Sequence, residues 1–225
     1  MIGTLVNTGA ILAGSIIGGL IKKGLKEEYQ KVLYDAMGLA ATGLGLHAVI
    51  TNMSNSNYPV LFIISLAIGG ILGTAINLDS KFTEFVGKYS KTNLGQGLST
   101  AIMLFCFGTL SVLGPIESAL NHNHTYLFTN AALDFVTSLV LGSTYGVGIA
   151  LSALVLFLWQ GGIFLLAYQL GPFVTPELMT EMSIVGGFLI FASGLSILKI
   201  KSIHTFNLLP ALLVPAVWFL LVRLF

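Results

Sequence analysis

The sequence predicts an all-α protein that crosses a membrane repeatedly, as a bundle of about eight transmembrane helices. Hydrophobic residues make up 55% of the 225 residues and charged residues only 8%, whereas a soluble domain carries about 25% charge. The mean hydropathy is +0.91. Apolar stretches of about 20 residues recur along the chain, and this length crosses a hydrocarbon core of about 30 Å. We therefore expect one integral membrane domain over residues 1–225, with the lipid bilayer as a partner.

The expected spans follow one another through mostly short polar loops. They cover residues 3–21, 33–51, 59–78, 98–120, the two arms of 130–170, 182–198 and 206–224. The first three spans carry several glycines, which let a neighbouring helix approach closely. Gly14 and Gly18 form a G-x-x-x-G pair in the first of them. The connector over residues 79–96 mixes aromatic residues with lysines, a pattern that indicates a helix lying on the membrane surface.

The apolar stretch 130–170 is long enough for two crossings and is interrupted at Gly146-Val147-Gly148. We expect two spans that fold back on each other at this glycine hinge. Asp134 lies near the start of the stretch. A carboxyl inside lipid costs about 2.5 kcal/mol or more, so such a group usually faces a partner or a water-filled cavity.

The basic residues predict the orientation of the chain. If eight spans alternate in direction, nine of the ten basic residues fall in loops on one side, and only Arg223 lies on the other. The side rich in lysine is then cytoplasmic. This interpretation places both termini outside.

Two segments indicate an internal repeat. Gly38 to Leu46 and Gly187 to Leu195 share the pattern G-x6-G-L. Pairing them matches spans 1–3 with spans 6–8, in halves over about 3–78 and 149–224 that flank central spans over 98–148. Since the offset is an odd number of spans, the repeat is inverted, as in many secondary transporters. Alternatively, the glycines serve helix packing alone.

Several short strings resemble the uncharacterised YqgA-like family of bacterial inner-membrane proteins, a domain of unknown function. They are Gly3-Thr-Leu-Val-Asn7, Phe105-Cys-Phe-Gly108, Gly114-Pro-Ile-Glu117, Leu133-Asp134-Phe-Val-Thr-Ser138, Gly146-Val-Gly148, Gln160-Gly161 and Asn207-Leu-Leu-Pro210-Ala211. The resemblance implies a bundle of seven or eight spans. This chain departs from the family pattern at Thr74, where the family usually has Glu, and at Glu117, where it has Gln.

Polar residues within the apolar spans are candidates for binding a solute or ion. They are Asp134, Glu117, Asn7, Gln160, Ser138 and Asn207. Asp134 can bind a cation or carry a proton, or it can cap the start of its span at the membrane interface. Glu117 can face Asp134 or lie solvated at the interface.

The four uncharged candidates have alternative roles as well. Asn7 and Gln160 lie in repeat-related spans and either line a solute path or hydrogen-bond across helices. The Ser138 hydroxyl lines the path or bonds its own helix backbone. Asn207 precedes Pro210, which either breaks the helix at a site or simply kinks it.

The motifs of several enzyme classes are missing from the sequence. It contains no nucleotide-binding P-loop, no H-E-x-x-H and no G-x-S-x-G. We expect no enzyme activity, no cofactor and no resident metal, with His122 and His124 in a solvated loop. The net charge of +1 gives no reason to expect nucleic acid as a partner. The lone Cys106 excludes an internal disulfide.

These observations predict a secondary transporter that moves a small solute or ion and is coupled through Asp134. The alternatives are an ion or solute channel and a non-transporting scaffold or accessory subunit. The glycine-rich helix faces allow a homodimer, although they fit internal packing equally well. The sequence identifies neither the solute nor the coupling ion.

Overall fold

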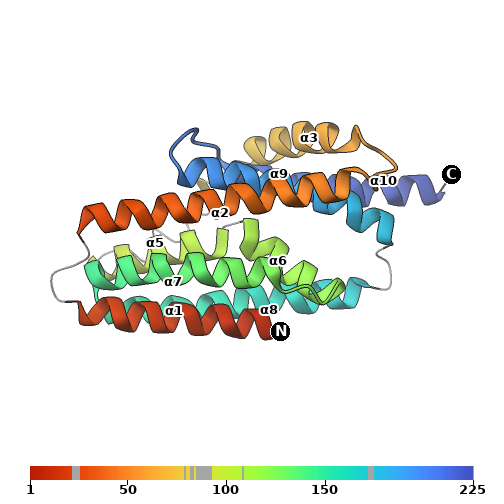
Figure 1. Cartoon of the computed structure of the whole chain (residues 1–225). Coiled ribbons are helices and arrows are strands. Elements are labelled where there is room, and N and C mark those ends of the chain that lie inside the picture. The colour runs from red at the N-terminus through yellow and green to blue at the C-terminus, as the bar shows by residue number, and fades with distance from the viewer. Residues whose placement is uncertain are drawn as a thin grey trace. The chain divides into compact units, whose positions relative to one another are not determined.

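The computed structural model is helical throughout its regular structure. It describes residues 1–21, 26–78, 80–81, 84, 93–107, 109–171 and 175–224 (Figure 1). The chain folds into two compact units. Unit 1 comprises Met1–Tyr34 and Phe82–Gly171, and unit 2 comprises Asp35–Lys81 and Pro172–Phe225.

Unit 1 contains five long helices, a short 3-10 helix and the first turns of α2. In chain order they are α1 (Ile2–Leu20), α2 (Glu27–Met53), α5 (Asn93–Phe107), α6 (Thr109–Leu120), α7 (Thr125–Tyr145), the 3-10 helix η1 (Val147–Leu151) and α8 (Ser152–Leu170). The helices α5 and α6 follow one another with a bend of 43°. Ile11, Phe105, Ile149 and Leu156 lie at the centre of the apolar core, with no exposed surface.

Helices α1 and α7 pack in parallel through glycines. Gly3 lies against Leu127, and Gly14 lies against the backbone of Phe135. A Cβ atom on Gly142 would come within 2.6 Å of the Ser15 carbonyl oxygen. Since both sets of residue numbers increase together, the two helices run in the same direction. The small residues predicted to allow close approach thus lie at a helix–helix contact.

The predicted glycine hinge forms the turn between α7 and α8. Helix α7 ends at Tyr145, and Gly146 follows with a φ of 90°. This left-handed backbone conformation suits glycine because other residues meet a steric penalty there. The chain then continues through η1 into α8, so the stretch 130–170 folds back as expected.

Unit 2 contains most of α2, then α3 (Leu61–Ile76), α9 (Pro176–Ile197), the 3-10 helix η3 (Thr205–Leu212) and α10 (Leu213–Leu224). Helices α2 and α9 are antiparallel, because Gly38 lies against Leu198 whereas Gly45 lies against Phe191. Helix α3 packs against η3, where Gly69 contacts Ala211 and Gly73 contacts Asn207.

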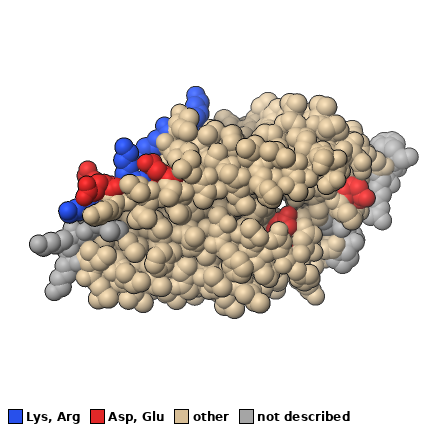
Figure 2. Space-filling view, in the orientation of Figure 1, with Lys and Arg blue, Asp and Glu red and all other residues tan. Residues whose placement is uncertain are grey.

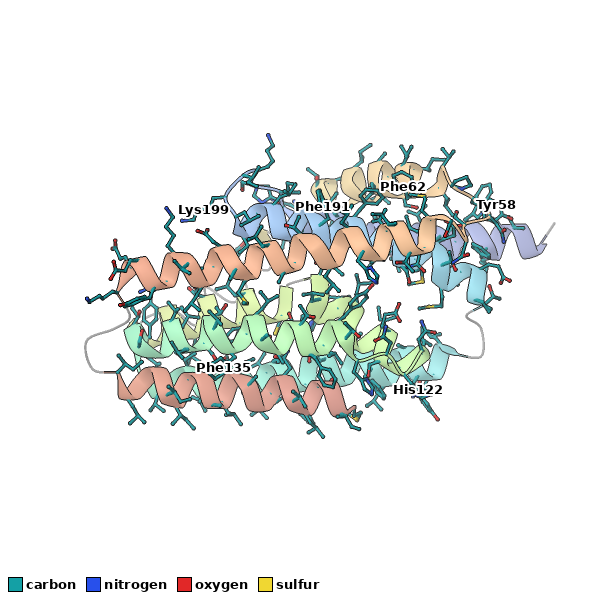
Figure 3. The ribbon with its side chains drawn as sticks, in the orientation of Figure 1. Tyr58, Phe62, His122, Phe135, Phe191 and Lys199 are labelled. Carbon is teal, nitrogen blue, oxygen red and sulfur yellow. The ribbon has the colours of Figure 1, made fainter. Side chains whose placement is uncertain are left out.

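Aromatic rings also join the elements of unit 2. The Phe62 and Phe188 rings stack with centroids 4.8 Å apart, which ties α3 to α9. The Tyr58 ring makes edge contacts with Trp218 and Phe219, each at 5.6 Å (Figure 3). These contacts attach the loop before α3 to α10.

Within the described residues, five helices are long and apolar enough to cross a membrane, or six if the bent α5–α6 pair counts as one span. The five are Ile2–Leu20, Glu27–Met53, Thr125–Tyr145, Val147–Leu170 and Pro176–Ile197. Two shorter apolar helices, Leu61–Ile76 and Asn207–Val222, cover the third and eighth predicted spans. Large hydrophobic side chains such as Leu20, Ile71 and Leu158 are exposed, as expected where helices face lipid. The surface drawn in Figure 2 is correspondingly poor in charge.

Several predicted helix starts were placed too late in the sequence, among them those of α2, which begins at Glu27 rather than at residue 33, and of α5, which begins at Asn93 rather than at residue 98. Helix α7 begins at Thr125 rather than at residue 130, so the predicted polar loop is shorter. Helix α9 begins at Pro176 rather than at residue 182. The Thr175 side chain caps it by accepting the Leu178 N–H, and proline at the first helical position favours a start there. The predicted surface helix over 79–96 lies largely outside the described residues.

Candidate functional site

Asp134 lies buried in the third turn of α7, with 4% of its surface exposed. Both α1 and α7 are long enough to cross a membrane. The glycine contacts that draw α1 onto α7 bring Asn7 beside this carboxyl. The alternative expectation, that Asp134 caps the start of its span, is wrong because the helix begins nine residues earlier, at Thr125.

Two amide groups hold one oxygen of this carboxyl. Asn7 Nδ2 donates a hydrogen bond to Asp134 Oδ2 at 2.9 Å, and Asn130 Nδ2 donates to the same oxygen at 3.0 Å. Asn130 lies one turn before Asp134 on α7, whereas Asn7 comes from α1. Within the described part of the chain, Asp134 Oδ1 accepts no hydrogen bond. The carboxyl is therefore oriented by two donors and keeps one oxygen available.

Helix α1 carries buried oxygens without hydrogen-bond partners among the described residues, at Thr4 and Asn7 and, further along the helix, at Ser15. Thr4 Oγ1 and Asn7 Oδ1 are fully buried, and neither has a hydrogen-bond partner among the described residues. Thr4 and Asn7 are three residues apart, which places them on the same face of α1. Most buried polar atoms in folded proteins are paired, so two such oxygens on one helix face need an explanation.

A second polar pair connects α8 with α6. Gln160 Nε2 donates to Ser111 Oγ at 3.1 Å, and both side chains are fully buried. Gln160 Oε1 has no hydrogen-bond partner within the described ranges. Gln160 thus bonds across helices, as one of its two predicted roles required.

The contacts of α6 and α7 place Ser111 and Asn130 at the same depth in unit 1. Leu127 of α7 lies against Gly114 of α6, and His124, just before α7, lies against Ser118 of α6. Residue numbers therefore rise along one helix as they fall along the other, so the two helices are antiparallel. Ser111 is three residues before Gly114, and Asn130 is three residues after Leu127. Ser111 and Asn130 therefore lie at a similar level along the α6–α7 pair.

Glu117 does not face Asp134 as one prediction held. Its Oε2 accepts a hydrogen bond from Asn121 Nδ2 at 2.8 Å, near the end of α6. The neighbouring Ser118 lies 2.8 Å from His124 Nδ1, which sets this level just before the start of α7. Asp134 is ten residues further along, or about 15 Å at a rise of 1.5 Å per residue. The two acids are consequently in separate environments.

The two remaining candidates lie apart from the carboxyl's hydrogen bonds. The buried Ser138 hydroxyl donates to the Phe135 carbonyl at 2.9 Å, so it bonds its own helix. Asn207 belongs to unit 2, where its backbone lies against Gly73. The six predicted residues therefore include one direct pair, Asn7 with Asp134, and a role for each in binding stays a prediction.

The sequence-based argument missed several residues that matter to these environments. Thr4, Ser111 and Asn130 were not predicted to take part, although Asn130 is four residues before Asp134 and Thr4 is three before Asn7. That helical spacing was the available signal. The buried acid Glu181 was also missed as a structural group. It accepts hydrogen bonds from Ser56 Oγ at 2.6 Å and from the Tyr58 backbone N–H at 3.1 Å.

Neither histidine of the H-x-H segment belongs to a metal cluster in the part of the chain that the structure describes. There, no group of three or more His, Cys, Asp or Glu residues is placed to hold a metal ion. His122 is exposed between α6 and α7 (Figure 3), and His124 is the residue paired with Ser118.

Comparisons with known proteins agree with the resemblance found in the sequence. The model of a family described as a protein of unknown function (DUF554) matches residues 2–220. The chain is 55% identical over 225 residues to the uncharacterized membrane protein YdfK of Bacillus subtilis (strain 168), covering 100% of this chain and 98% of that protein. It is 27% identical over 224 residues to the uncharacterized protein YqgA of Escherichia coli (strain K12), covering 95% and 94%. No solved structure matches the chain.

Proposed function

We propose that this chain, which belongs to the DUF554 family of unknown function, is a secondary transporter. Its relative YdfK is described as a membrane protein. The chain moves a small solute or ion across the bacterial inner membrane and is coupled through Asp134. The observation that carries the proposal is a buried carboxyl between two candidate membrane spans, oriented by Asn7 and Asn130. A carboxyl in such a place is costly and is typical of ion or proton pathways.

The coupling role follows from the charge of the site. An ionised Asp134 without a counterion places a net charge inside an apolar helix pair. A bound cation or proton cancels that charge and lowers the cost of enclosing the site in the membrane interior. Occupied and empty sites therefore favour different conformations, which is the requirement for coupling an ion gradient to transport.

Helix directions within each unit support eight crossings, an even number that leaves both termini on the same side of the membrane. Alternation requires spans 1 and 5 to run the same way, and α1 and α7 are parallel. It requires spans 2 and 7 to oppose each other, and α2 and α9 are antiparallel. The five long helices, the bent pair and the two shorter apolar helices supply the necessary eight segments.

The contact between α2 and α9 supports an inverted repeat. An offset of 149 residues relates Gly38 to Gly187, and replacing both residues of one contact by their counterparts under this offset gives another contact of the same helix pair. A Cβ on Gly45 would lie 2.7 Å from the Gly187 carbonyl oxygen, and one on Gly194 would lie 2.9 Å from that of Gly38. These two contacts are equivalents of each other, since Gly194 is the counterpart of Gly45. Such exchange is the signature of a pseudo-two-fold axis, as in transporters built from inverted repeats.

A second pair of contacts at the same helices follows the same rule. A Cβ on Gly187 would lie 3.0 Å from the Val49 backbone nitrogen, and one on Gly38 would lie 3.1 Å from that of Leu198. Val49 and Leu198 are again related by the 149-residue offset. Both pairs of contacts thus follow the exchange that is expected if an inverted repeat relates α2 to α9.

The test compares two removals of a carboxyl charge. Full-length protein in proteoliposomes is screened for electrogenic uptake of small polar and cationic solutes under sodium and proton gradients. Asp134→Asn should abolish gradient-driven uptake, whereas Asp35→Asn, which changes an exposed carboxyl on α2, should leave it unchanged. Unchanged uptake by Asp134→Asn at equal incorporation would remove the coupling role.

The same assay separates the competing functions. A saturable flux that follows the gradient supports a transporter, whereas a flux that does not saturate supports a channel. Wild-type protein that moves no solute or ion under either gradient would favour a scaffold or accessory subunit. The proposal assigns no enzyme activity, cofactor or nucleic-acid partner, and it is compatible with a homodimer.

A further inference from the structure

We propose that the coupling ion is sodium, a monovalent metal cation held by oxygens of Asp134, Asn7 and Thr4 between α1 and α7. The inference rests on the proposed transport function and specifies its coupling ion. Its starting point is the set of buried oxygens without partners beside the carboxyl, since hydrogen bonds within the described residues leave them unused. A cation supplies what each of them lacks.

The oxygen types fit a hard cation. Hard cations prefer carboxylate, amide carbonyl and hydroxyl oxygens over nitrogen and sulfur ligands. Asn7 donates its amide nitrogen to Asp134 Oδ2, so its amide oxygen Oδ1 remains as a possible ligand on the same group. Thr4 Oγ1 lies on the same helix face, one turn earlier. Asp134 Oδ1 is the charged member of the set.

The charge of the surrounding helices selects a monovalent ion. The sequences of α1, α5, α7 and α8 contain one ionisable carboxylate, Asp134, and no Lys or Arg. Glu117 on α6 lies about 15 Å away along the helix direction. One sodium ion therefore neutralises the site, whereas a divalent ion would leave a buried positive charge without a partner.

The arrangement also distinguishes sodium from a proton. A proton on Asp134 Oδ1 can donate one hydrogen bond, so at most one of the unpaired oxygens of Thr4 and Asn7 gains a partner. A metal cation contacts both oxygens and the carboxylate at once. The second unpaired oxygen is thus explained by sodium and is left unexplained by protonation.

The experiment measures equilibrium binding of ²²Na⁺ to the purified full-length protein, with N-methyl-D-glucamine as the balancing cation. Wild-type protein should bind saturably, and Asp134→Asn should abolish binding. Thr4→Val should weaken the sodium affinity roughly tenfold, the effect of losing one neutral polar contact. Thr4→Ser retains the hydroxyl and should restore most of the affinity.

The matched control is Thr8→Val, one turn further along α1. The Thr8 hydroxyl donates to the Thr4 carbonyl at 2.8 Å, so it belongs to the helix backbone and not to the proposed ligand set. Thr8→Val should leave sodium affinity unchanged. Excess Li⁺ should compete with ²²Na⁺ better than Ca²⁺ does at equal concentration. Monodisperse elution in size-exclusion chromatography verifies that each variant is folded.

The outcomes separate this inference from the proposed function. No saturable ²²Na⁺ binding by folded wild-type protein, or equal binding by Thr4→Val and wild type, overturns the sodium site. If Asp134→Asn nevertheless loses uptake and uptake follows a pH gradient, the transporter stands and its coupling ion is the proton. If sodium binds as expected but Asp134→Asn transports normally, the transport proposal fails and the binding site remains.

Discussion

Two glycine-lined helix contacts in this molecule have different roles, although small residues produce both. In unit 1, α1 and α7 run parallel and enclose a carboxyl, two amides and two oxygens without partners. In unit 2, α2 and α9 run antiparallel, and their glycines meet backbone atoms of the opposite helix in a symmetric pattern. Close approach alone therefore does not define a site. The unpaired polar atoms distinguish the first contact from the second.

Each contact also has one buried acid in its helices, and the two buried acids differ in their partners. Glu181 of α9 accepts hydrogen bonds from a hydroxyl and from a backbone N–H of the loop that precedes α3, and these bonds attach the loop to the helix. Asp134 accepts two amide donors on one oxygen and leaves the other available. The comparison suggests a structural acid in unit 2 and a functional acid in unit 1.

The largest effect should come from filling the close approach in either contact. Gly18→Ala places a methyl group 2.9 Å from the Ser143 backbone nitrogen, and backbone cannot move aside cheaply. We expect a loss of about 1–3 kcal/mol in the free energy of unfolding, the cost of overpacking. The measurement is denaturation of the purified protein by SDS in mixed micelles.

The control for this change is Gly9→Ala on the same helix. Nothing lies within 4 Å of a Cβ atom at Gly9. Alanine favours a helix interior over glycine by about 0.5–1 kcal/mol, so Gly9→Ala should be neutral or stabilising. Equal losses for the two variants would show that the loss at Gly18 does not come from the contact with α7.

Which of these features could be predicted from the sequence depends on how far apart in the chain the interacting residues lie. Hydropathy and the Gly146 turn depend on local sequence, so the helical character of the apolar stretches and the fold-back of 130–170 were predicted, whereas five or six of the eight predicted spans pass as membrane-crossing helices within the described residues. Asp134 stood out because a carboxyl in an apolar run is conspicuous by itself. Its partner Asn7 is 127 residues away, and no single-sequence pattern pairs the two.

Errors in the prediction arose where polar residues lie inside helices. Thr125 and Asn130 were assigned to a loop because they are polar, yet α7 already includes them. Asn130 is accommodated there because its amide bonds Asp134 one turn later. One of the two alternatives for Glu117 was that it faces Asp134, because their spans are consecutive. The helix register, which the Ser118–His124 contact reveals, separates them instead.

The second effect tests the distinction between the two acids. Glu181→Gln weakens two hydrogen bonds to a charged acceptor, and we expect a loss of about 1–2 kcal/mol in the free energy of unfolding. Asp134→Asn removes a buried charge while an amide oxygen can still accept from Asn7, so stability should be unchanged or higher. Thermal unfolding in detergent, without sodium, compares the two variants directly.

This comparison has an outcome that would reverse the assignment. If Asp134→Asn destabilises the protein as much as Glu181→Gln does, both acids serve the fold. Ser56→Ala provides an independent check, because it removes one donor to Glu181 at 2.6 Å and both residues belong to unit 2. It should lower the midpoint in the same direction as Glu181→Gln, by a smaller amount.

The smallest expected effect is a difference close to zero, and it tests the symmetry of unit 2. Gly45→Ala and Gly194→Ala are related by the 149-residue offset and meet equivalent backbone atoms, 2.7 Å and 2.9 Å from the new methyl group. Each should be destabilising, and their losses should agree within about 0.5 kcal/mol, a typical effect of context alone. Gly43→Ala, which nothing approaches within 4 Å, provides the baseline for α2. A large loss at only one of the two positions would mean that the symmetric geometry does not extend to energetics. The repeat would then be a matter of shared glycine packing, and the support it gives to alternating access would be lost, whereas the carboxyl in unit 1 would be unaffected.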